Sequence, residues 1–195
     1  SRRTELTSDA SELKSAIDNL RANGSTGVDY GLEEVRRVLN GARDNAQKVV
    51  IVFTDGEPNH DNGFDNEVAA ESVNIAKSIK DGGALVYSIG VFQGADPSDT
   101  SDNFNQYMHG MSSNYPTATA EGDNGFLGIF GAYFRVDFGT PAEKQGYYKA
   151  AEDADQLNNI FNEIFDEIKT PGSSPTEVEE GFQGAGGYIT FTDTV

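Results

Sequence analysis

The chain has 195 residues, 36% of them hydrophobic, which is enough to bury the core of one domain. Its 32 acidic residues against 14 basic ones give a formal net charge of -18, a field that repels nucleic acid and anionic membrane surfaces. Cysteine is absent, which excludes disulfides, thiolate catalysis and thiolate metal sites, and no apolar run is long enough to span a membrane. Nucleic acid is therefore excluded as a partner, as is direct membrane insertion.

Two amphipathic helices are predicted before the first strand. The segment "TSDASELKSAIDNL" has apolar residues at helical spacing, namely Leu13, Ala16, Ile17 and Leu20. Asp9 and Glu12 are spaced as a capping box for this helix. After the turn "RANGSTG", the second helix ends near Gly41 and has its apolar stripe at Leu32, Val35, Val38, Leu39 and Ala42.

A β-α-β unit is predicted in the middle of the chain. Residues 48–53, "KVVIVF", are too few for a helix and too uniformly apolar for a strand with one wet face, so they are predicted to be a central strand of a parallel sheet. The helix that follows stops at "DGG" and is outlined by Val68, Ala69, Val73, Ile75, Ala76 and Ile79. Residues 84–91, "ALVYSIGV", are predicted to be a second buried strand.

The later elements continue this alternation. The segment "DPSDTSDN" caps a short helix around residues 104–111, and "GYYKA" is predicted to be a third short strand. A last helix, capped by Asp153 or Asp155, ends at Pro171 and has its stripe at Leu157, Ile160, Phe161, Ile164, Phe165 and Ile168. We therefore expect an α/β fold with a doubly wound, Rossmann-like, mostly parallel sheet and helices on both faces.

The composition changes after residue 170. Residues 171–187 are rich in Gly, Pro, Ser and Glu, which is typical of a linker. Residues 188–195 alternate like a half-buried strand and are predicted to be the first strand of a following β domain. The expected organisation is thus one domain over residues 1–170, a linker, and the start of another domain.

Asp55 follows the predicted central strand, at the edge where open parallel sheets bind ligands. A hard divalent cation takes oxygen ligands, and "NGSTG" offers the hydroxyls of Ser25 and Thr26 just before a helix. The alternative is local structure, with Thr26 capping its helix and "TDGEPN" forming a turn. His60 and His109 have no paired Cys or His motif, so they are interpreted as ordinary loop or helix-surface residues.

The chain resembles a von Willebrand factor type A domain in four segments that follow in order, "LTSDASELKSAIDNLRANGSTGVDYGLEEVRRVL", "KVVIVFTDGEPN", "ALVYSIGVF" and "YYKAAEDADQLNNIFNEIFDEI". The resemblance covers most of residues 1–170. The segment "NFNQYMHGMSSNYPTAT" resembles the version found in large surface proteins and pilus adhesins of Gram-positive bacteria. "GYITFTDTV" is similar to the start of the β domain that follows there.

The resemblance implies a metal-ion-dependent adhesion site, in which three loops supply D-x-S-x-S, a Thr and an Asp to Mg²⁺ or Mn²⁺. Thr26 in "GSTG" and Asp55 in "TDGEP" match the Thr and the Asp, with Ser25 as a neighbour. No D-x-S-x-S precedes them, so the chain is expected to lack the first strands of the fold and to bind Mg²⁺ weakly or not at all. In an alternative placement, "YITFTDTV" fills the vacant position in the sheet and brings Asp193 near Asp55.

The resemblance also implies a binding module for cell-surface adhesion and not an enzyme, with a protein or matrix ligand supplying a carboxylate to the metal. The expected partner is a host or matrix protein, or another surface protein, and the expected location is extracellular, at the cell surface or cell wall. One alternative is a structural stalk or pilus module without metal-dependent binding. Another is a doubly wound α/β hydrolase or nucleotide-dependent enzyme, although G-x-S-x-G and G-x-x-x-x-G-K-[ST] are absent.

An insertion at residues 121–146, "EGDNGFLGIFGAYFRVDFGTPAEKQG", holds many apolar residues for a loop. Long irregular connections are often functional, and aromatic anchors beside a metal give ligand specificity. The candidate ligand-binding residues are Phe126, Phe130, Tyr133 and Phe134. The alternative is a hairpin that folds back on the domain and buries its own aromatics.

Overall fold

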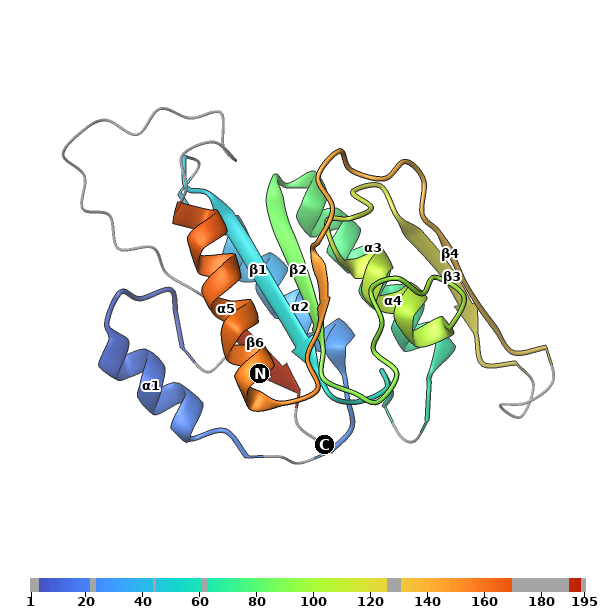
Figure 1. The fold of residues 1–195 in the computed structure, drawn as a ribbon, viewed down its shortest axis with the longest axis horizontal. Coiled ribbons are helices and arrows are strands. Elements are labelled where there is room, and N and C mark those ends of the chain that lie inside the picture. Colours follow the sequence, from blue (N-terminus) through green and yellow to red (C-terminus); the bar gives the residue numbers. More distant parts are fainter. Residues whose placement is uncertain are drawn as a thin grey trace.

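The computed structural model describes residues 4–21, 24–43, 45–60, 63–125, 131–169 and 190–193. Within these ranges, one sheet has the strand order β5-β2-β1-β6, and a second sheet consists of the pair β3-β4 (Figure 1). Every pairing in the first sheet is parallel. The predicted Rossmann-like α/β fold is therefore confirmed.

β1 (Lys48–Thr54) lies between two parallel neighbours, as predicted for a central strand. It pairs with β2 (Ala84–Gly90) over its whole length. β5 (Tyr148–Ala150) extends the sheet beyond β2. The three strands predicted for the main domain are therefore present, and β1 continues one residue past the apolar run, to Thr54.

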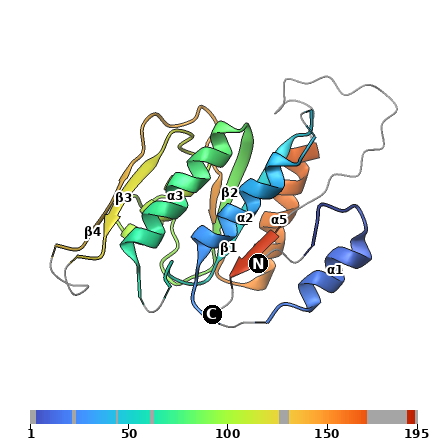
Figure 2. The same cartoon turned by 180° about the vertical axis from the view of Figure 1, so that it is seen from behind.

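Helices cover both faces of the sheet. They are α2 (Val28–Asn40), α3 (Asn66–Asp81) and α5 (Ala154–Lys169). Val50 and Val52 of β1 join the core formed with α2 and α3, whereas Ile51 joins the core formed with α5. Figures 1 and 2 show α5 on one face and α2 with α3 on the other. Because both faces of β1 are buried, its sequence has no polar alternation.

α1 (Ala10–Asp18) forms where a helix is predicted, but it does not pack on the sheet. Asp9 caps it by accepting hydrogen bonds from the N–H groups of Ser11 and Glu12. No residue of the helix is buried, and Ile17 is 59% exposed. Figures 1 and 2 both show α1 standing apart from the other helices, so its apolar stripe is not covered by the described part of the chain.

β6 (Thr190–Asp193) pairs in parallel with the other side of β1, with Asp193 opposite Thr54. This is the position given by the alternative placement of the C-terminal segment. Residues 171–187, predicted to be a linker, lie outside the described residues, as does half of the strand predicted for 188–195. The division of the chain into domains therefore stays a prediction.

The insertion forms an antiparallel hairpin of β3 (Thr119–Asp123) and β4 (Tyr133–Asp137). Asn74 of α3 closes the outer edge of β3, because its side chain accepts from the Ala120 N–H at 3.0 Å and donates to the Ala120 carbonyl at 2.9 Å. Gly122 is required here, since a Cβ at this position would lie 1.9 Å from the carbonyl oxygen of Asn66. The hairpin therefore packs directly along α3.

Aspartates begin three further helices by bonding to backbone N–H groups of the first turn. Asp65 caps α3, Asp102 caps α4 (Asn103–Met111), and Asp153 caps α5 by accepting from the Gln156 N–H. Of the two caps predicted for the last helix, Asp153 is thus the one used. Among the described residues, no helix combines the length and the hydropathy of a membrane span.

Candidate functional site

Two loops at the carboxyl end of β1 hold the predicted site residues. Residues 24–27 lead into α2, and residues 55–60 follow β1. The Asn59 N–H donates to the Thr26 carbonyl oxygen at 3.0 Å, and the Ser25 hydroxyl donates to the His60 carbonyl oxygen. The structure therefore brings together the two segments that the sequence assigns to one site.

A buried aspartate and a histidine clamp these loops to each other. Asp29, in the first turn of α2, is 2% exposed, and both of its carboxylate oxygens lie 3.1 Å from Nε2 of His60. The Tyr30 ring stacks on the His60 ring with centroids 4.6 Å apart. A buried carboxylate is costly unless it is paired. The contact with His60 therefore supports Asp29 and fixes the second loop against the helix.

The oxygens of Asp55 and Thr26 remain free within the described part of the chain. The exposed Asp55 carboxylate has no hydrogen bond or ion pair there, and neither does the hydroxyl of the nearly buried Thr26. Thr26 does not cap its helix, because Gly27 is the N-cap and, among the described residues, no side chain makes a capping hydrogen bond there. Thr54 makes the turn after β1, with its hydroxyl bonded to the N–H and the carbonyl of Gly56.

The oxygen atoms of these side chains fit part of the coordination shell of a hard divalent cation. Mg²⁺ takes oxygen ligands, keeps several waters and needs only one or two carboxylates. Asp55 has a free carboxylate, Thr26 has a free hydroxyl, and the Ser25 oxygen can still accept although its hydrogen is used. The described residues contain no group of three or more His, Asp or Glu side chains placed to hold a metal. A cation held here would therefore rely on hydroxyl and carboxylate oxygens from both loops.

Neither partner of this contact stands out in the sequence as a site residue, because Asp29 belongs to no motif and His60 has the features of an ordinary loop residue. A signal for Asp29 was present. It lies three residues before Leu32 on the face of the helix that also carries Val35, and a carboxylate on an apolar stripe indicates a buried partner. Nothing local identifies that partner as His60, which lies 31 residues further along the chain.

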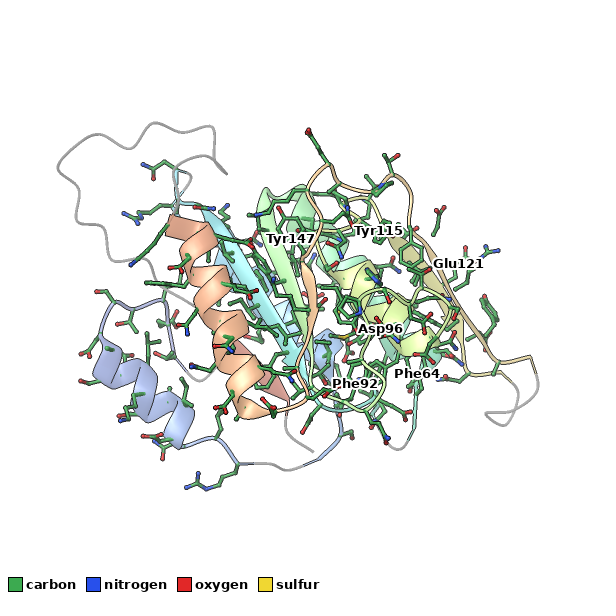
Figure 3. All side chains as sticks on the ribbon, in the orientation of Figure 1. Phe64, Phe92, Asp96, Tyr115, Glu121 and Tyr147 are labelled. Atoms are coloured by element: carbon green, nitrogen blue, oxygen red, sulfur yellow. The ribbon has the colours of Figure 1, made fainter. Side chains whose placement is uncertain are left out.

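The four candidate aromatics of the insertion differ in position. Phe126 and Phe130 lie outside the described residues. Tyr133 is 49% exposed on β4. Phe134 is buried, and its ring meets the Phe64 ring edge-on with centroids 5.3 Å apart (Figure 3 labels Phe64). Phe134 therefore belongs to the core, as the alternative of a hairpin burying its own aromatics predicts, and it is not available to a ligand.

His109 is buried, so its interpretation as a surface histidine is wrong. Its Nε2 lies 3.0 Å from the Pro97 carbonyl oxygen, and its Nδ1 lies 3.3 Å from the side-chain nitrogen of Asn114. Burial lowers the pKa of His109. Both ring nitrogens are engaged, which leaves neither for a metal.

The comparison with known proteins agrees with this architecture. A family model described as von Willebrand factor type A domain matches residues 2–123. No match was found among curated proteins or among solved structures. Domains of this family are Rossmann-like protein-interaction modules and commonly bind a divalent metal. Because the matched residues make up more than half of the chain, the protein belongs to the von Willebrand factor type A domain family.

Proposed function

We propose that this protein is a binding module that engages a protein partner through a divalent cation at the face formed by residues 24–27 and 55–60. One observation carries the proposal: two clamped loops leave the Asp55 carboxylate and the Thr26 hydroxyl free at the carboxyl end of the sheet. Ligands of open parallel sheets bind at this end.

Each site residue has a distinct role. Asp55 supplies a carboxylate oxygen, Thr26 a hydroxyl oxygen, and Ser25 a neighbouring oxygen. Mg²⁺ or Mn²⁺ held there offers an open coordination position to a carboxylate of the partner. The contact between His60 and Asp29 holds the loops in place before a partner arrives, and such preorganisation lowers the cost of binding.

The charge of the molecule explains why a cation is needed. A net charge of -18 repels an acidic group on a partner, and a bound cation offsets that repulsion at the point of contact. The partner is accordingly a host or matrix protein, or another surface protein, with an exposed Asp or Glu. The setting is the surface of a Gram-positive bacterium.

Calorimetric titration of the chain with Mg²⁺ and Mn²⁺ tests the proposal. We expect a dissociation constant of about 1 mM, because this chain supplies few ligands. Asp55→Asn and Thr26→Val each remove one ligand and should weaken binding about tenfold or more. Glu57→Gln is the matched control, because it removes the same charge from an exposed position on the same loop.

Two further measurements make the result decisive. Asp55 is exposed, so Asp55→Asn should change the free energy of unfolding by no more than about 0.5 kcal/mol. Acetate added to the Mn²⁺-loaded protein should displace water from the open position and lower the proton relaxivity. The proposal fails if Glu57→Gln weakens metal binding as much as Asp55→Asn does, or if neither variant weakens it.

A further inference from the structure

A groove of about 580 Å³ lies between α3 and the hairpin that packs along it. Its walls carry the side chains of Glu71 on α3, Glu121 on β3 and Tyr133 on β4. The rest of its lining includes three buried apolar residues, Ala70, Ile75 and Ala120, and the polar residues Asn74 and Ser78. Figure 3 places Glu121 on the hairpin, on the side of the molecule away from α1. The groove shares no residue with the proposed metal-binding face.

The two walls of this groove are held at a fixed spacing. The Asn74 side chain bonds to both the N–H and the carbonyl of Ala120, at 3.0 and 2.9 Å. Asn66 donates from its side-chain nitrogen to the Asp123 carbonyl oxygen at 3.1 Å. These contacts tie β3 to α3 at two points along the helix, so a ligand does not have to assemble the groove.

We propose that this groove binds an arginine side chain presented by a basic segment of a protein partner. The aliphatic stem of the arginine lies against the apolar residues of the lining. Its guanidinium group lies against the ring of Tyr133, which is 49% exposed, and donates to the carboxylates of Glu71 and Glu121. The net charge of -18 attracts such a basic segment from a distance.

One carboxylate of the groove already makes a weak contact of this kind, with an arginine that does not itself line the groove. Arg135 of β4 lies 3.4 Å from Glu121, and the two side chains are 75% and 69% exposed. An ion pair this exposed contributes little to stability, so an arginine of a partner can replace Arg135 at small cost. Glu71 has no ion pair with the described residues. The groove therefore offers two carboxylates to a partner's arginine. That of Glu71 has no ion pair with the described residues, and that of Glu121 is easily released from Arg135.

The test is a titration of the ¹⁵N-labelled chain with the peptide acetyl-Gly-Arg-Gly-amide, followed by NMR in the presence of EDTA. We expect saturable shifts at the amides of residues that line the groove, with Gly122 and Tyr133 among the largest. A peptide with citrulline in place of arginine keeps the shape and loses the charge, so it should cause no such shifts. Binding should not need a divalent cation, which separates this inference from the proposed metal-dependent function.

Variants identify the contacts. Glu71→Gln and Tyr133→Ala should each weaken the peptide about two- to fivefold, whereas Tyr133→Phe keeps the ring and should retain binding. Glu67→Gln is the matched control, because Glu67 is exposed one turn earlier on α3 and does not line the groove. Arg135→Ala removes the internal competitor and should tighten binding.

Three results would overturn the inference. The citrulline peptide shifting the same amides equally would show that charge is not recognised. If Glu67→Gln weakened peptide binding as much as Glu71→Gln, the peptide would be attracted only by the long-range field of the acidic molecule. Shifts centred outside the groove would place the binding elsewhere.

Discussion

At the scale of single residues, buried polar groups are paired mainly with the backbone. Lys80, near the end of α3, is buried and donates from Nζ to the carbonyl oxygens of Gly110, Ser112 and Tyr115 at 2.8, 3.0 and 2.9 Å. Two of these carbonyls belong to the end of α4 and the residue just after it, where helices lack internal partners. A lysine from another helix therefore completes the end of α4.

His109 is held in its neutral form by a similar arrangement. Its Nε2–H donates to the Pro97 carbonyl, and its Nδ1 accepts from the side-chain N–H of Asn114. The oxygen of that amide already accepts two backbone N–H groups, so the amide cannot turn around. A proton on Nδ1 would face the side-chain N–H of Asn114, so this contact disfavours the charged ring, as burial also does. Burial lowers the pKa of His109 although Asp96 and Asp99 favour its charged form.

This arrangement predicts a loss of stability in mild acid. Below about pH 6.5 the unfolded chain protonates His109 while the folded chain resists, so the free energy of unfolding falls as the pH falls towards the lowered pKa. Urea unfolding at pH 7.5 and at pH 5.5 measures the difference. His109→Gln should be less stable at both values but show a smaller difference between them. An unchanged difference would show that His109 does not cause the loss.

At the scale of elements, α3 and α1 share one capping geometry but differ in packing. Asp65 accepts from the N–H groups of Glu67 and Val68 at 3.0 and 3.1 Å, and from the side chain of Asn124 at 2.9 Å. Burial raises the pKa of Asp65, but these hydrogen bonds outweigh it and the pKa is lowered. Asp65 thus links the start of α3 to the hairpin, whereas α1 buries none of its residues.

The two caps should therefore respond differently to substitution. Asp65→Ala should lower the free energy of unfolding by about 1–2 kcal/mol, because it removes a cap from a helix of the core. Asp9→Ala removes the same type of cap from α1 and should change the free energy of unfolding by less than about 0.5 kcal/mol. Urea unfolding followed by near-ultraviolet circular dichroism measures both. Equal losses would mean that α1 is part of the cooperative core.

The sequence predicts the elements whose signals are local. β1, α3 and α5 follow from apolar periodicity and from turn residues at their ends. The hairpin could not be distinguished from a binding loop, because its supports, Asn74 and Phe64, are about 46 to 70 residues away in the chain. The same holds for the site. Thr26 and Asp55 are visible as a motif, whereas the Asp29 contact that joins their loops depends on tertiary structure.

At the scale of the whole molecule, the fold separates two proposed binding surfaces. The parallel sheet places the loops of residues 24–27 and 55–60 together at one end, and we propose this end as the site where a cation binds an acidic group of a partner. The hairpin adds an acidic and aromatic groove along α3 for a basic group. A molecule with a net charge of -18 attracts basic segments unaided but needs a cation to hold an acidic one.

The central claim, that Asp55 and Thr26 hold a divalent cation, is tested most directly by paramagnetic broadening. Substoichiometric Mn²⁺ is added to the ¹⁵N-labelled chain, and the loss of each amide signal is recorded. The account predicts that residues 24–27 and 55–60 broaden first, that EDTA restores them, and that Asp55→Asn prevents the effect. Broadening centred on another acidic segment, such as residues 96–102, while these two loops stay sharp, would contradict it.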